Sequence, residues 1–215
     1  MEANYNFDAE EQRVEPIVYL EKGLNTSAQK YIEPLKNYIK EKKTISVTYQ
    51  PFDEDAYARI VSPYFIKEYN NRWFLFGHQH AIKPEAYEGI TNISLDRILA
   101  IKPSLKPYEP KGYLNIKEYL SDVVGVSISD KDKITIRFKV HGGRRNYVDT
   151  KKIHHSQKTI EMNSAFGLFS ISVIPNRELY SHLLGFGGDM EIISPQVVRD
   201  KMKEHASKLS KRYES

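Results

Sequence analysis

Between residues 44 and 102 the sequence carries a series of short strand-like segments, and this series constrains the fold more than any other feature. In the first segment Ile45, Val47 and Tyr49 alternate with polar residues, which is the pattern of a half-buried strand. Further segments of this kind occupy residues 57–62, 64–68, 72–78, 91–95 and 99–102, with turn signals at Pro51, Asn70-Asn71 and Pro84. Short strands joined by tight turns favour a small barrel or a strongly bent sheet.

A segment rich in proline follows these strands and marks a domain boundary. It spans residues 103–112 and contains Pro103, Pro107, Pro110 and Gly112, a composition typical of linkers. Before the strands, residues 16–20 predict a short strand, and proline at position 34 favours a helix from there to about residue 43. The expected organisation is a connector of strand and helix (1–43), the barrel (44–103), a linker with a short helix at 116–120 (104–132) and a second domain (133–215).

The second domain is predicted to mix strands and helices, which assigns the chain to the α+β class. Ile134, Ile136, Phe138 and Val140 alternate with polar residues, and residues 158–162, 168–173 and 190–193 predict further strands. Helices are expected after the capping residue Asn176 and after Ser194-Pro195, where serine would cap and proline would take the first helical position. With a helix within residues 144–152, the order becomes β-α-β-β-α-β, a split βαβ sandwich.

Composition limits the classes of protein and of chemistry. Hydrophobic residues make up 40% of the 215 residues and charged residues 28%, as in folded globular proteins. The sequence has no cysteine, which excludes disulfides, thiol nucleophiles and cysteine-based zinc sites, and we expect a cytoplasmic location. No membrane-spanning apolar run and no common catalytic motif is present, so we expect neither an enzyme nor a cofactor. His141, His154 and His155 lack metal-ligand spacing, and no metal site is predicted from them.

A basic cluster occupies residues 133–158, where eight lysines and arginines face a single acid, Asp149. Such a cluster is either an electrostatic footprint for nucleic acid or another anion, or simply a solvated face. The candidate contact residues are Arg144, Arg145, Lys151 and Lys152.

Four motifs in the first domain resemble a WYL domain. They are Ile45-Ser46-Val47-Thr48-Tyr49, Arg59-Ile60-Val61-Ser62-Pro63-Tyr64, Arg72-Trp73-Phe74-Leu75-Phe76-Gly77-His78 and Leu95-Asp96-Arg97-Ile98. The second domain is similar to the WCX-type extension that commonly follows WYL domains, through Asn146-Tyr147-Val148, Ile153-His154-His155-Ser156-Gln157, Asn176-Arg177-Glu178-Leu179 and Ile193-Ser194-Pro195. The match covers roughly residues 16–215.

This resemblance implies an Sm-like barrel, a ferredoxin-like extension and the role of an effector-sensing module in a bacterial transcriptional regulator. Such regulators bind DNA through an N-terminal winged-helix domain, which is not expected within these 215 residues, and they are expected to form homodimers. Two features depart from the family pattern. Phe74 replaces a tyrosine, and Thr91 and Ser94 stand where a further arginine is common, so an anion pocket would carry fewer charges.

The expected ligand is a nucleotide, an oligonucleotide or another anion bound in the WYL barrel, because arginine forks suit phosphate and aromatic rings stack on bases. The predicted ligand-binding residues are Tyr49, Arg59, Tyr64, Trp73, His78 and Arg97. For Trp73 and Phe74 core packing is the alternative, and for Arg97 it is a local ion pair with Asp96. A second hypothesis is a constitutive dimerisation module that binds nucleic-acid backbone through the basic cluster without an effector.

Overall fold

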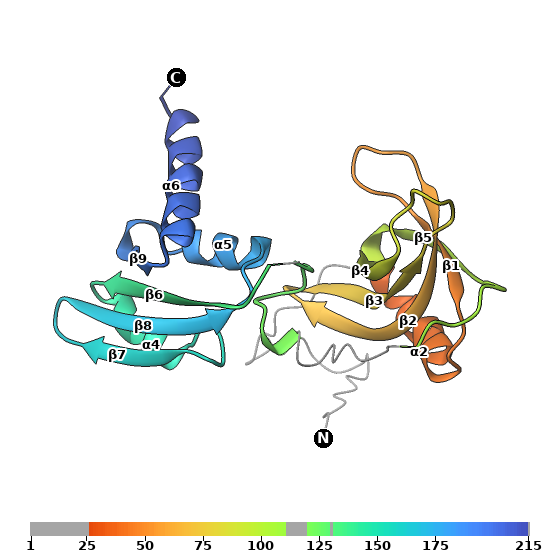
Figure 1. Cartoon of the computed structure of the whole chain (residues 1–215), viewed down its shortest axis with the longest axis horizontal. Helices are drawn as coiled ribbons and strands as arrows, with labels where there is room; N and C mark the ends of the chain where they lie inside the picture. Colours follow the sequence, from red (N-terminus) through yellow and green to blue (C-terminus); the bar gives the residue numbers. More distant parts are fainter. Residues whose placement is uncertain (1–25, 111–119, 130, 215) are drawn as a thin grey trace, which may run out of the picture.

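The computed structural model describes residues 26–110, 120–129 and 131–214, which form two sheet-containing domains lying side by side (Figure 1). The strand predicted at residues 16–20 lies outside the described residues, as does nearly all of the helix predicted at 116–120. Among the described residues, no helix is both long enough and apolar enough to cross a membrane.

The first domain, here called the barrel domain, is a five-stranded antiparallel sheet with two short helices at its start. Its elements are α1 (Thr26–Gln29), α2 (Ile32–Lys40), β1 (Ile45–Tyr49), β2 (Tyr57–Tyr69), β3 (Arg72–His80), β4 (Gly89–Ser94), η1 (Leu95–Arg97) and β5 (Ile98–Pro103). The strand order is β4-β3-β2-β1-β5. The small all-antiparallel sheet expected for an Sm-like barrel is therefore confirmed.

The helix α2 begins and ends earlier than the sequence suggested. It starts at Ile32 and ends at Lys40, so the predicted range 34–43 was wrong at both ends. Pro34 lies in the first turn of α2, where its missing N–H group would have no helical partner in any case. The helix packs on the barrel core through the fully buried Leu35.

The segments predicted as two strands on either side of Pro63 form the single 13-residue strand β2. The pairing of β2 with β3 shifts register between Pro63 and Phe65, a bulge that accommodates the residue lacking an N–H donor. Asn70 and Asn71 then turn the chain with φ angles of 53° and 59°, the left-handed pair required by a two-residue hairpin turn.

Gly77 is the paired partner of Pro63 and has no room for a side chain. A Cβ atom at this position would collide with the Ser62 carbonyl oxygen and lie 2.7 Å from Cγ1 of Val61. We expect Gly77→Ala to lower the free energy of unfolding by about 1–3 kcal/mol, the usual cost of overpacking, as measured by urea denaturation. Gly143→Ala is the matched control, because nothing lies within 4 Å of a Cβ there. Equal stability of the two variants would contradict this account of the bulge.

The second domain, here called the C-terminal domain, has the predicted β-α-β-β-α-β order. Its elements are β6 (Ile134–His141), α4 (Arg144–Thr150), β7 (Lys158–Met162), β8 (Phe166–Val173), α5 (Arg177–Leu184), η2 (Gly187–Asp189), β9 (Met190–Ser194) and α6 (Gln196–Lys211). The antiparallel sheet has the order β7-β8-β6-β9, in which β8 is inserted between the two strands of the first βαβ unit. The split βαβ arrangement is confirmed.

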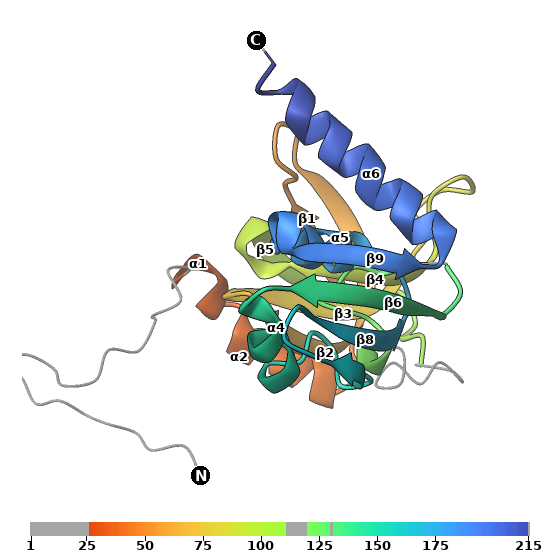
Figure 2. The ribbon, with the colours of Figure 1, turned by 90° about the vertical axis from the view of Figure 1, so that its left-hand side faces the viewer.

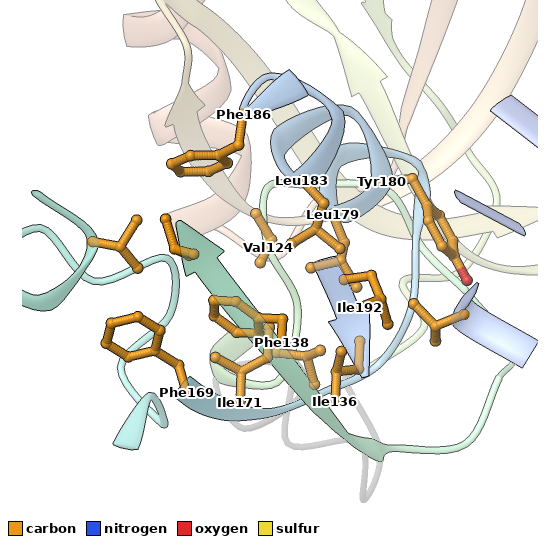
Figure 3. Packing of buried hydrophobic residues seen from close by; sticks show 14 residues of the cluster. Val124, Ile136, Phe138, Phe169, Ile171, Leu179, Tyr180, Leu183, Phe186 and Ile192 are labelled. Carbon is orange, nitrogen blue, oxygen red and sulfur yellow. The ribbon is translucent and has the colours of Figure 1, made fainter. Parts of the chain in front are cut away.

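The core of the C-terminal domain lies between its sheet and α5 (Figure 3). Phe138 of β6 and Phe169 of β8 stack with ring centroids 5.6 Å apart, and Leu179 and Leu183 of α5 are fully buried against this layer. Asn176 caps α5 as predicted, since its side-chain oxygen accepts from the Leu179 N–H at 2.9 Å. This cap fixes the start of the helix that later contributes to the site.

The last helix, α6, lies beside β9 (Figure 2). Pro195 occupies the N-cap position without a side-chain cap, so the prediction that Ser194 caps this helix was wrong. Val198 is fully buried, whereas Leu209 and Tyr213 near the C-terminus are 59% and 81% exposed. The C-terminal turns of α6 project beyond the domain (Figure 1).

Candidate functional site

The two domains meet along residues 124–127, a segment held from both sides. The carbonyl oxygens of the segment accept hydrogen bonds from Lys67 Nζ at Gly125 (2.8 Å), Asn92 Nδ2 at Val126 (2.8 Å) and Asn176 Nδ2 at Val124 (2.8 Å). Burial lowers the pKa of Lys67. The two barrel-domain side chains and Asn176 of the C-terminal domain thus fix one stretch of chain between them.

A cleft of about 850 Å³ opens beside this segment, and both domains line it. The barrel domain contributes Tyr49, Phe52, Tyr69, Asn70, Arg72, Phe74, Asn92, Ser94 and Arg97, and the rest of the lining is Val126, Ser127, Arg177, Glu178, Ser181 and His182. The volume is in the range of small-molecule sites. The aromatic and polar lining, with an arginine on each side of the domain boundary, makes this cleft the candidate functional site.

Arg97 enters the cleft from η1, the turn between the two edge strands. Its guanidinium carbon lies 5.7 Å from the ring centroid of Tyr49 and 4.7 Å from that of Phe52, within the range of cation–π attraction. The Arg97 carbonyl accepts from the Gln50 N–H at 3.0 Å, which ties η1 to the end of β1. The side chain is therefore positioned by two elements that are distant in sequence.

Asp96 has other partners than the neighbouring Arg97. Ser94 Oγ donates a short hydrogen bond to Asp96 Oδ1, and Arg72 NH1 lies 3.9 Å from Asp96 Oδ2. Asp96 and Arg97 both belong to the 3-10 turn η1. Arg72, from the start of β3, takes the place in the ion pair that sequence reasoning had considered for Arg97.

Two buried polar atoms of the cleft residues have no hydrogen-bond partner among the residues that the structure describes. They are Nε of Arg97, which is a donor, and Oε2 of Glu178, which is an acceptor. The other carboxylate oxygen of Glu178 accepts from Ser127 Oγ at 2.7 Å. Because unpaired buried polar groups are costly, they mark places where a ligand can supply the missing partner.

Of the predicted ligand-binding residues, Tyr49 and Arg97 line the cleft. The guanidinium carbon of Arg59 also lies near Tyr49, 5.3 Å from its ring centroid. The guanidinium group, however, donates hydrogen bonds to Gln79 Oε1 (2.5 Å) and to Thr91 Oγ1 (2.6 Å). Burial lowers the pKa of Arg59. Thr91, which stands in the region where the family often has a further arginine, thus accepts a hydrogen bond from Arg59.

Tyr64, Trp73 and His78 lie elsewhere in the barrel domain. Tyr64 is 3% exposed and its hydroxyl donates to the carbonyl oxygens of Glu109 and Pro110, while burial raises its pKa to about 12. Trp73 packs against the barrel core, the alternative foreseen for it, whereas its neighbour Phe74 lines the cleft. His78 lies next to His80 and Glu88.

The basic cluster of the C-terminal domain is partly neutralised in three dimensions. Arg144 Nε lies 3.5 Å from Asp189 Oδ2, and Arg145 NH1 donates to the Gly142 carbonyl at 2.5 Å. Lys151 Nζ lies 5.6 Å from the ring centroid of Tyr147, and Lys152 is exposed. Asp189 is far from the cluster in sequence, so a count along the chain overestimated the local charge.

Sequence reasoning did not select Arg72, Arg177 or Glu178 as site residues, although all three occur in the motifs that carried the family resemblance. The motifs identified the fold, but nothing in their spacing indicated that the start of β3 and the start of α5 meet across a domain boundary.

Two family models match this chain, one in each domain. The model of the WYL domain matches residues 30–103, and that of the WCX domain matches residues 131–210. The proteasome accessory factor B/C (PafBC) of Arthrobacter aurescens is 15% identical, with a TM-score of 0.35, over 89% of this chain and 28% of that protein. A structure described as a CRISPR Cas-related protein is 14% identical, with a TM-score of 0.48, over 87% of this chain and 51% of its own.

The chain therefore spans about a quarter of one of these solved structures and half of the other. Among curated proteins no match was found. Matches to both domain models, in the order in which the two sheets occur, establish the family: this chain belongs to the WYL-domain proteins and carries a WYL domain followed by a WCX domain.

Proposed function

We propose that this chain is the ligand-sensing region of a transcriptional regulator, and that its ligand is an anion, either a nucleotide or a short single-stranded nucleic acid, bound in the cleft between the two domains. The observation that carries the proposal is that Arg72 and Arg97 of the WYL domain and Arg177 of the WCX domain line one cleft, in which a guanidinium nitrogen of Arg97 is buried without a partner among the described residues.

The chemistry of the lining suits a nucleotide better than a simple inorganic anion. Guanidinium groups bind phosphate oxygens in a bidentate fork, and the aromatic rings of Tyr49, Phe52 and Phe74 offer surfaces on which a base stacks. Glu178 Oε2, an acceptor without a partner among the described residues, suits a ribose hydroxyl or an exocyclic amine. A nucleotide supplies all three kinds of group.

A ligand in this cleft would act by changing how the two domains are held. It contacts both domains, so it stabilises the relative orientation that fits it best and shifts the population toward that orientation. In a homodimer with winged-helix domains attached ahead of residue 1, such a shift would alter the spacing of the DNA-binding elements.

The test is a screen of nucleotides and short oligodeoxynucleotides and oligoribonucleotides by thermal shift, followed by calorimetry. A ligand present at 100 times its Kd stabilises by about 2.7 kcal/mol, which for a chain of this size raises Tm by about 5–10 °C. A panel without any binder would contradict the proposal.

The same screen separates the alternative, a constitutive module that binds nucleic-acid backbone through the basic cluster. That alternative predicts binding that collapses with added salt and is lost in an Arg144→Met, Arg145→Met double variant. The cleft proposal predicts that the double variant binds as the wild type does.

A further inference from the structure

His78, His80 and Glu88 come together at the edge of the barrel domain, away from the cleft. His78 and His80 are two residues apart on β3, so their side chains lie on the same face of the sheet. The pairing of β3 with β4 runs from His78 with Ile90 to Gln79 with Gly89, and continuing it sets residue 88 opposite His80. Topology alone thus brings the three residues to one face.

The distances between these side chains suit a metal ion. His78 Nε2 lies 3.3 Å from Glu88 Oε1, and one potential ligand atom from each residue lies within 4.8 Å of the others. Two nitrogen or oxygen ligands of a tetrahedral zinc ion are roughly 3.3 Å apart. His78 and Glu88 already have this spacing, and the exposed Glu88 is free to adjust toward His80.

His80 is held in a fixed orientation by groups behind it. It is 5% exposed, and its Nε2 is 2.8 Å from Ser62 Oγ, which accepts from the Glu109 N–H at 2.9 Å. With Nε2 engaged, Nδ1 is the ring nitrogen left to bind a metal ion. Metal-binding histidines in proteins are oriented by such a hydrogen bond on the second nitrogen.

We propose that His78, His80 and Glu88 bind a divalent transition-metal ion of the zinc class. Two histidines and one glutamate form a known zinc ligand set, which leaves one position for water or a further ligand. The ion would join the end of β3 to the loop before β4 and, through Ser62, to the chain that leaves the barrel at Glu109. This proposal is independent of the proposed function, because none of the three residues lines the cleft.

The test uses the full chain, from which a chelator has first removed any bound metal. One titration adds Zn²⁺ in competition with a chromophoric chelator, and a second adds Co²⁺ and follows visible absorption. We expect one Zn²⁺ per chain and the d–d absorption of tetrahedral or five-coordinate Co²⁺. His78→Gln and Glu88→Gln should each weaken Zn²⁺ binding by more than about tenfold. Both side chains are at least partly exposed, so circular dichroism should show that the variants remain folded.

Two matched controls use histidines of the WCX domain. His141 Nε2 lies 3.5 Å from Glu191 Oε2, and the ring centroid of His155 lies 4.2 Å from that of His154. His141→Gln and His155→Gln should bind Zn²⁺ as the wild type does. The proposal is overturned if no stoichiometric ion binds, if His78→Gln and Glu88→Gln leave the affinity unchanged, or if His155→Gln abolishes binding.

Discussion

Replacing Arg97 by methionine is expected to weaken binding of the anionic ligand by about tenfold to a hundredfold. A hydrogen bond to a charged group contributes about 1.5–3 kcal/mol, and Arg97 is the cleft arginine whose Nε is buried without a partner among the described residues. Methionine keeps an unbranched apolar stem over the rings of Tyr49 and Phe52. The free energy of unfolding should therefore change little.

The measurement is calorimetry with the best ligand of the screen, and the control is Arg137→Met. Arg137 is exposed on β6 and does not line the cleft, so its removal lowers the net charge equally. An Arg97→Met protein that binds as tightly as the wild type would remove Arg97 from the site.

Gly125→Ala is expected to be the most disruptive single change at the domain boundary. Gly125 has φ of +86°, and a Cβ there would lie 2.7 Å from Cγ of Glu178 and 3.2 Å from Cε1 of Tyr69. Backbone strain of about 1–3 kcal/mol then adds to overpacking of about 1–3 kcal/mol. Since Tyr69 and Glu178 belong to different domains, the strain is relieved most easily by separating them.

Two measurements check this prediction, namely urea denaturation and limited trypsin digestion at Lys131 and Lys133. The variant should lose about 2–6 kcal/mol of stability and be cleaved faster at these lysines. Gly188→Ala is the control, because nothing lies within 4 Å of a Cβ at that position. Unchanged stability and unchanged cleavage would show that residues 124–127 do not hold the domains together.

Within each domain, the sequence predicted the fold well because local patterns encode it. Alternation in Ile134, Ile136 and Phe138 identified β6, and the cap at Asn176 identified the start of α5. The errors came from proline. At Pro63 a bulge keeps β2 continuous, and at Pro34 the first helical turn tolerates the missing donor, so neither proline ends its element.

The candidate site was harder to predict, because it depends on how the domains are placed. Tyr49 and Arg97 were named from the WYL motifs, and the structure brings them together through the turn η1. Arg177 and Glu178 line the same cleft from the other domain, and Gly125 lies close to Glu178 and Tyr69 at the domain boundary. No periodicity or spacing along a chain records such a contact. In the same way, Asp189 reduces the charge of the basic cluster from outside it.

The most direct test of the central proposal is hydrogen exchange of the chain with and without the tightest ligand of the screen. The account predicts slower exchange on both sides of the cleft, at residues 49–52 and 92–97 of the WYL domain and at residues 177–182 of the WCX domain. Protection confined to one domain, for example to the strands around Arg59 or to α4 beside Lys151 and Lys152, would contradict a ligand bound between the two domains.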